Sequence, residues 1–255
     1  MSGGHALALT GVACDPRSAV RGLDPRAKLI GLLAVTLVAV STPLAAWPVY
    51  AGCAAVLGAY AVAARVSARV AWRRWRVVLP LVLAAGVLLP FARPGGAAYA
   101  LGPLTLHEEG LRAFAAVAAK AGIGTLSAVL LGATATFPEV LRGMAALRVP
   151  RLLVLIAAFM YRYLFVMVEE ASRMRGALAA RGFRPRTALG AAGVGRIAAA
   201  LFLRTHARGE RVYLAMLARG YRGSVPQLVG LRLTRSDVAF VVLVLAALVP
   251  LRVAA

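Results

Sequence analysis

Residues 114–135 read FAAVAAKAGIGTLSAVLLGATA, an apolar run of 22 residues with one charged side chain, Lys120. A helix needs roughly 20 predominantly apolar residues to cross the hydrocarbon core of a bilayer. The run therefore predicts a transmembrane helix. Lys120 lies among Ala, Gly and Ser residues, which form close helix contacts in membranes. The sequence leaves open whether this lysine serves packing or function.

Apolar runs at 29–47, 49–64, 77–92 and 238–251 bring the number of predicted spans to five. Hydrophobic residues make up 61% of the 255 positions. Together these features indicate an all-α membrane protein with several spans rather than a soluble domain. Prolines on both sides of Trp47 predict a tight turn between the first two spans.

The net charge of +21 comes from 30 Lys and Arg against 9 Asp and Glu. In a membrane protein such an excess favours anionic lipid and an acidic protein partner over nucleic acid. The arginines cluster before the first span, after the second, and throughout 139–235. Because positive loops stay in the cytoplasm, the N-terminus and 139–235 are predicted to be cytoplasmic. The C-terminus is then outside.

A further run, 152–168, is apolar enough by hydropathy to be a sixth span. It contains Arg162, whose role the sequence leaves open. Counting it as a span would move arginine clusters to the wrong side. We therefore expect long amphipathic helices at the cytoplasmic face, since Pro favours a first helical turn and Gly a helix end. They are predicted from Pro150 to Gly182 and from Leu189 to Gly220, after a shorter one from Pro138 to Leu147. The predicted segments are 1–137 (transmembrane helices), 138–235 (cytoplasmic helices) and 236–255 (final transmembrane helix).

The two long predicted helices end in related pentapeptides. These are Ala180-Arg181-Gly182-Phe183-Arg184 and Ala218-Arg219-Gly220-Tyr221-Arg222. An arginine at a helix C-terminus is favourable with the helix dipole, and glycine ends helices, which accounts for one copy. Two copies predict two guanidinium groups presented to a partner, because the planar fork binds carboxylates and carbonyls bidentately. The aromatic residues are expected to fill shallow apolar slots.

This pair of motifs resembles the Ala-Arg-Gly signatures of the transmembrane (T) component of energy-coupling factor (ECF) transporters. Residues 209–223, GERVYLAMLARGYRG, are most similar to the CbiQ-type cobalt branch. The segment Leu23-Asp24-Pro25-Arg26-Ala27-Lys28 resembles the N-terminal signature of the family. The same residues also predict a helix start, with Asp24 as N-cap, Pro25 in the first turn, and Arg26 and Lys28 anchoring the first span inside.

The resemblance implies a non-catalytic coupling subunit in the bacterial inner (plasma) membrane. In such systems two ABC ATPase subunits bind ATP and Mg²⁺, and an integral-membrane substrate-specificity (S) subunit binds cobalt or nickel. The T component has no cofactor of its own, and its arginine-tipped helices enter grooves on the ATPases. T components of vitamin importers share the arginine motifs, so a vitamin system is an alternative. A stand-alone membrane transporter or a lipid-bound scaffold is another.

Catalysis and metal binding are not expected on this chain. A Walker A glycine loop is missing, so the chain is not expected to hydrolyse ATP itself. His5, His107 and His206 are scattered and have no acidic partner at helical spacing in our interpretation, which predicts no metal site. The two cysteines form no CxxC pair, and Cys53 is expected to be a small buried hydrophobe.

Overall fold

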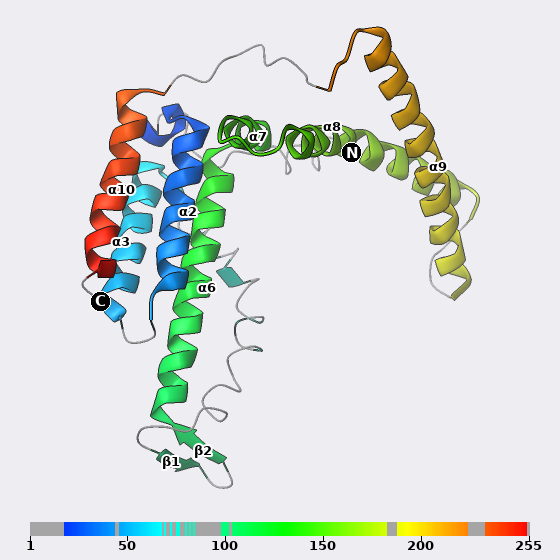
Figure 1. The fold of residues 1–255 in the computed structure, drawn as a ribbon. Coiled ribbons are helices and arrows are strands. Elements are labelled where there is room, and N and C mark those ends of the chain that lie inside the picture. The colour runs from blue at the N-terminus through cyan, green and yellow to red at the C-terminus, as the bar shows by residue number, and fades with distance from the viewer. Residues whose placement is uncertain are drawn as a thin grey trace. The chain divides into compact units, whose positions relative to one another are not determined.

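The computed structural model describes residues 18–43, 46–67, 98–101, 104–182, 188–223 and 233–253, with single positions between 69 and 84. These residues form two compact units. One lies within Leu147–Gly230, and the other combines Leu7–Ala146 with Leu231–Ala255. Figure 1 shows the elements of both units.

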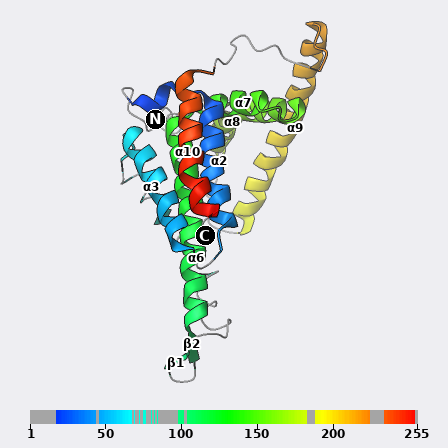
Figure 2. The ribbon, with the colours of Figure 1, turned by 60° about the vertical axis from the view of Figure 1, so that its left-hand side comes forward.

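Four helices lie side by side in the second of these units, as two views agree (Figure 1, Figure 2). They are α2 (Pro25–Ser41), α3 (Trp47–Ala63), α6 (Glu108–Thr134) and α10 (Arg235–Val253). The core between them consists of aliphatic side chains, tyrosine rings and the Cys53 thiol, and it includes Val35, Leu57, Leu130 and Leu248. The expectation that Cys53 is a buried hydrophobe is confirmed.

The outer faces of this bundle are also apolar. Leu33 and Leu37 on α2 and Leu243 on α10 are each more than half exposed. A helix that is hydrophobic all round belongs in a large core or in a membrane. Among the described residues, α6, α10 and α8 (Arg151–Ala180) are long and apolar enough to cross a membrane, and α3 is a shorter apolar helix. The predicted class, an all-α membrane protein, is confirmed, while the number of spans stays a prediction.

Helix α2 begins as the sequence predicts. The carboxylate of Asp24 accepts a hydrogen bond from the backbone N–H of Arg26 at 2.8 Å, and Pro25 occupies the first turn. The helix ends at Ser41, earlier than the predicted limit at residue 47. Pro43 biases the residue before it towards extended backbone, and Thr42 has φ −74° and ψ 133°. Trp47 is instead the first residue of α3.

Helix α6 begins at Glu108, six residues before the predicted limit at 114. The carboxylates of Glu108 and Glu109 lie in its first turn, where the helix dipole favours negative charge. A hairpin that the sequence did not predict precedes it. Strands β1 (Ala98–Leu101) and β2 (Leu104–His107) pair antiparallel with Leu101 opposite Leu104. The predicted third span, 77–92, lies almost entirely outside the described residues.

Two glycines let α10 approach its neighbours closely. A Cβ on Gly31 of α2 would lie 2.6 Å from a ring carbon of Phe240, and one on Gly52 of α3 would lie 2.8 Å from a methyl group of Leu251. Small residues at such positions allow close van der Waals packing of membrane helices. The last helix of the chain is thus built into the bundle against the first two.

Helix α7 (Phe137–Ala146) matches the short helix that the sequence predicted from Pro138 to Leu147. It belongs to the same unit as the bundle and packs on the start of α2. A Cβ on Gly143 would lie 2.8 Å from a methyl group of Leu29 and 3.3 Å from the Cβ of Pro25. The close contact explains why a glycine stands at this position.

The unit within Leu147–Gly230 contains two long helices, α8 and α9 (Ala188–Ala218). Their bounds agree with the predictions from Pro150 to Gly182 and from Leu189 to Gly220 to within two residues. No residue of α8 is fully buried, although its first half is strongly apolar. The apolar side chains in this half of α8 are therefore not fully covered by other residues in the part of this unit that the structure describes.

Candidate functional site

The first Ala-Arg-Gly motif ends α8. Arg181 is the C-cap, and Gly182 adopts a left-handed backbone with φ +76°. The N–H of Gly182 donates to the carbonyl of Ala179 at 3.0 Å. Glycine adopts this conformation without the steric cost that other L-residues incur. The helix ends at the predicted glycine, with Arg181 rather than Gly182 as the C-cap, whereas Phe183 and Arg184 lie outside the described residues.

The second motif, at the end of α9, repeats this geometry. Gly220 has φ +80° and donates its N–H to Leu217 at 2.9 Å, and the N–H of Tyr221 reaches the carbonyl of Met216 at 3.0 Å. These two bonds make up a Schellman motif, which satisfies carbonyls left open at the helix end. A Cβ on Gly182 or Gly220 would meet nothing within 4 Å. Backbone conformation alone therefore requires these glycines.

Both motif arginines face solvent. Ala180, Arg181, Ala218, Arg219 and Arg222 are exposed, and Tyr221 is partly buried. No ion pair or side-chain hydrogen bond joins Arg181 or Arg219 to another residue in the described ranges. The geometry suits the predicted docking role because the guanidinium donors are available at both helix ends. The docking role itself remains a prediction.

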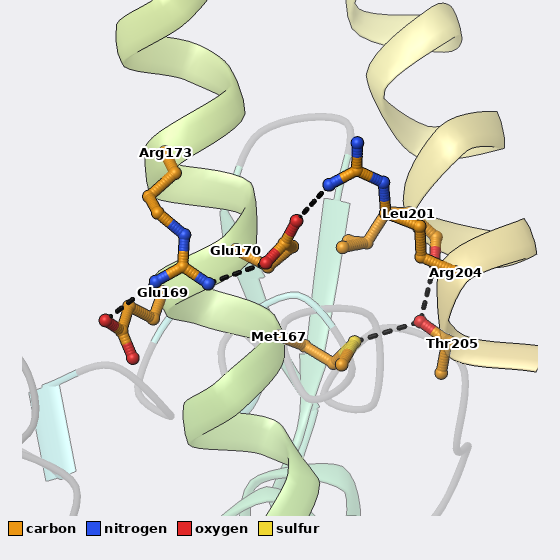
Figure 3. Close-up of polar contacts among 7 residues, drawn as sticks. All are labelled: Met167, Glu169, Glu170, Arg173, Leu201, Arg204 and Thr205. Atoms are coloured by element: carbon orange, nitrogen blue, oxygen red, sulfur yellow. Dashed lines mark hydrogen bonds and ion pairs between the residues drawn. The ribbon is translucent and has the colours of Figure 1, made fainter. Parts of the chain in front are cut away.

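A polar cluster joins α8 to α9 at their contact (Figure 3). The carboxylate of Glu170 accepts hydrogen bonds from Arg173 on its own helix, at 2.6 Å, and from Arg204 on α9. Arg173 also pairs with Glu169 at 2.8 Å, and the hydroxyl of Thr205 lies 2.9 Å from the sulfur of Met167. Sequence reasoning missed this cluster. Its signal is that Glu169 and Glu170 are adjacent acids in an arginine-rich segment.

A groove of about 370 Å³ runs between α8 and α9, at the scale of a small ligand site. It extends from Arg204, at the contact just described, to Arg181 in the first motif. The lining residues are Met174, Ala177, Leu178, Arg181, Gly193, Arg196, Ile197, Ala200 and Arg204. Apolar side chains and three guanidinium groups thus share one small space.

The N-terminal signature connects α2 with α6, α10 and the short 3-10 helix η1 (Ala19–Gly22) at one end of the bundle. The backbone N–H of Asp24 donates to the carboxylate of Asp237 on α10 at 2.7 Å. Lys28, only 2% exposed, donates to the carbonyl of Thr134 at the end of α6 at 3.0 Å and to that of Arg21 at 3.4 Å. Lys28 is therefore not the surface anchor that we predicted, because its ammonium group is buried and donates to backbone carbonyls instead of to water.

Asp237 is the partner that sequence reasoning missed. It is 1% exposed and accepts hydrogen bonds from the backbone N–H and the hydroxyl of Thr234, at 2.7 and 2.6 Å. Its signal in the sequence is a Thr three residues before an Asp at the start of an apolar run, the pattern of a capped helix. Arg26 is partly buried, with its Nε 4.0 Å from Asp24.

Comparison with known proteins places these features in a family. The profile of the CbiQ family, described as "Cobalt transport protein", matches residues 16–228. The chain belongs to the CbiQ family. The match includes the segment from Asp24 to Lys28 and both Ala-Arg-Gly motifs.

Individual relatives of this CbiQ-family chain are distant. The cobalt transport protein CbiQ of Rhodobacter capsulatus is 29% identical over 163 residues, which cover 62% of this chain and 64% of that protein. Two uncharacterized proteins of Methanocaldococcus jannaschii are 27% identical over 178 residues (66% of this chain, 60% of the relative) and 30% over 102 residues (40% and 38%). The chain thus spans less than two thirds of the length of each of these relatives.

Of the two ionisable residues at predicted membrane depth, Lys120 has a defined contact in this CbiQ-family structure. Its ammonium group donates to the carbonyl of Val40 at 2.9 Å, and Arg252 of α10 donates to the carbonyl of Ser41 at 3.0 Å. Both carbonyls belong to the last turn of α2, which leaves carbonyls without intrahelical partners. Lys120 therefore has a packing role. Arg162 is exposed on α8.

The histidine interpretation needs one correction. His206 and Glu210 are four residues apart on α9, and their Nε2 and Oε1 atoms lie 3.7 Å apart. The prediction that the histidines lack an acidic partner at helical spacing is therefore wrong for His206. Within the described ranges no three His, Cys, Asp or Glu residues gather into a possible metal site. That this CbiQ-family chain carries no metal stays a prediction.

Proposed function

We propose that this chain is the transmembrane coupling subunit of an ECF-type ABC importer for cobalt or nickel. The repeated helix end carries the proposal. In a chain of the CbiQ family, Arg181 and Arg219 are exposed at the C-termini of two long helices, each followed by a left-handed glycine. Two equivalent cationic tips suit a pair of equivalent partner subunits.

The partners at the tips are two ABC ATPase subunits, which bind ATP and Mg²⁺ and carry out hydrolysis. A guanidinium group presents donors in a rigid fork that matches carboxylates and backbone carbonyls in a groove. The C-terminal ends of α8 and α9 are where such groups point outward. No catalytic residue is assigned to this chain, and its role is mechanical.

The apolar face of α8 fits a membrane-embedded partner. Large side chains recur every fourth residue and are exposed, namely Leu152, Ile156, Met160, Leu164 and Val168. An apolar face of this size requires a cover. We assign it to the integral-membrane substrate-specificity subunit, which holds the cobalt ion as cargo, and to membrane lipid.

Coupling follows from the length and stiffness of these helices. With 30 and 31 residues, α8 and α9 are each on the order of 45 Å long. ATP binding would bring the two ATPases together, and the arginine tips would follow them. The far ends of α8 and α9 would then shift against the substrate-specificity subunit and turn its ion towards the cytoplasm. This is a rigid-body movement of packed helices driven by a partner.

The setting is the plasma membrane of a bacterium, with the N-terminus and both long helices on the cytoplasmic side. Support comes from the distribution of arginines, because positive segments remain inside. In this arrangement α8 lies at the membrane surface rather than across it, so that both tips face the ATPases.

Replacing the tip arginines tests the proposal. We expect Arg181→Ala or Arg219→Ala to impair metal uptake, and the double variant to abolish uptake and co-purification of the ATPases. Truncating a buried charged anchor costs about 2 to 5 kcal/mol of binding. Lys at either position should rescue poorly, because it lacks the planar fork. Uptake of radioactive cobalt and recovery of the ATPases are the measurements.

The matched control is Arg175→Ala, since Arg175 is an exposed arginine on α8 six residues before the first tip. It should leave uptake near the level of the unmodified chain. Near-normal uptake by the Arg181→Ala, Arg219→Ala double variant, at the same abundance in the membrane as the unmodified chain, would refute the coupling role. Two well-capped helices would then be all that the motifs provide.

A further inference from the structure

The groove between α8 and α9 combines chemical features that single out one kind of ligand. Part of its lining is apolar, because Ala177, Gly193 and Ala200 are small and Leu178 and Ile197 add aliphatic side chains. Arg181, Arg196 and Arg204 line the same groove. Three like charges in one small concave space repel one another, and the repulsion is relieved when an anion binds between them.

One of these arginines, Arg204, already pairs with a carboxylate of the chain itself. Glu170 pairs with Arg204 and with Arg173 outside the groove. In the described part of the chain, neither Arg181 nor Arg196 has an ion-pair partner or a side-chain hydrogen bond. Both are exposed. The groove therefore holds two guanidinium groups whose donors are available to a ligand.

We propose that this groove binds a short acidic segment of the ATPase subunit that docks on the tip of α8. Its carboxylate would bridge Arg181 and Arg196, as Glu170 bridges Arg173 and Arg204, and an apolar neighbour would rest on Leu178 and Ile197. The proposal rests on the proposed function and makes the docking reciprocal. The tip of α8 enters the ATPase, and the ATPase places a side chain beside α8.

Size and position favour this occupant. A volume of about 370 Å³ is near the lower limit for ligand pockets, so it holds a few side chains rather than a whole helix. Arg181 belongs both to the exposed helix end and to the groove lining, so a partner on the first is in reach of the second. Carboxylates bind paired guanidinium groups in fixed bidentate geometry, which adds specificity to attraction.

Arg196 provides the test, because it lines the groove but lies outside both motifs. We expect Arg196→Ala in the full chain to weaken binding of the purified ATPases by about tenfold or more, and Arg196→Glu by still more. Arg175→Ala, on α8 but outside the groove lining, should change the dissociation constant less than about twofold. Equal affinities for the Arg196→Ala and Arg175→Ala variants would overturn the proposal.

A photo-crosslinking residue in place of Ile197 identifies the occupant independently of any loss of affinity. In membranes that contain the whole complex, the crosslink should form to an ATPase subunit and fall at least severalfold in combination with Arg196→Glu. Crosslinks to phospholipid or to the substrate-specificity subunit instead would overturn the proposal.

The failure of this inference is distinguishable from failure of the coupling role. If the Arg181→Ala, Arg219→Ala double variant loses the ATPases but Arg196→Ala retains full affinity, the groove is not a docking site and the coupling role stands. If the double variant keeps both ATPases and uptake, both proposals are wrong.

Discussion

Each Ala-Arg-Gly motif sets a cation directly before a glycine with a left-handed backbone. Gly182 and Gly220 end their helices, so Arg181 and Arg219 stand where the unsatisfied carbonyls of the last turn concentrate negative potential. The field favours the charge of both arginines, and both residues are exposed. One local rule thus serves both the end of the helix and the presentation of its arginine.

Replacing a glycine by alanine should destabilise the end of α9 at Gly220 but stabilise the helix at Gly209. Gly220→Ala forces an L-residue into the left-handed region, at a cost of about 1 to 2 kcal/mol to the last turn. Gly209 is in the helix interior, where an added Cβ meets nothing within 4 Å, so Gly209→Ala should stabilise α9 by roughly 0.5 to 1 kcal/mol. Hydrogen exchange of the amides from Ala215 to Tyr221 is the measurement. Slower exchange in the Gly220→Ala variant would contradict the prediction.

Helix ends were predictable where the signal is local. Pro150 and Gly182 bracket α8, and Asp24 caps α2, because each acts on its immediate neighbours. Contacts between distant positions were not predictable in this way. Asp237 bonds to Asp24 across 213 residues of sequence, and Glu170 pairs with Arg204 across 34. The pattern of one helix does not show which other helix will pack against it.

Asp237 should be the most sensitive residue at the junction of α2, α6 and α10. Asp237→Ala removes the buried carboxylate that accepts the backbone N–H of Asp24, and leaving this buried donor unsatisfied costs about 1 to 3 kcal/mol. Asp237→Asn should lose less than Asp237→Ala, because its amide oxygen can still accept hydrogen bonds from Asp24 or Thr234. Thermal unfolding of the detergent-solubilised chain measures the effect.

The control for this junction is the adjacent position. Ser236 is exposed at the start of α10, and Ser236→Ala should stay within about 0.5 kcal/mol of the unmodified chain. A loss for Asp237→Ala no larger than that of the Ser236→Ala variant would show that the buried contacts do not hold α10 in place.

At the scale of the whole molecule, hydropathy and charge disagree about α8. Its length and composition suffice for a membrane span, whereas the arginines before and after it belong on one side of the membrane. Charge decides in our interpretation, because a span at α8 would separate α7 from the second motif by a bilayer. Composition predicts a membrane protein without settling this point, since an apolar face suits lipid and a membrane partner equally.

Cysteine labelling tests that arrangement. In a background with Cys14→Ser and Cys53→Ala, we expect Arg142→Cys on α7 and Gly209→Cys on α9 to react with an impermeant maleimide only from the cytoplasmic side. Ser41→Cys, exposed at the end of α2, should react only from outside and serves as the control for sidedness. Labelling of the Arg142→Cys and Gly209→Cys variants from opposite sides would show that α8 crosses the membrane.

The contacts of α2 have a consequence for biosynthesis. The backbone N–H of Asp24, just before α2, donates to Asp237, and the carbonyl of Ser41, at the end of α2, accepts from Arg252, so α10 contacts both ends of α2. Helix α2 is synthesised long before α10, and until α10 is present these backbone groups lack their native partners. We therefore expect a chain that ends before α10 to leave the end groups of α2 without these partners and to be a target for the quality-control proteases of the cell.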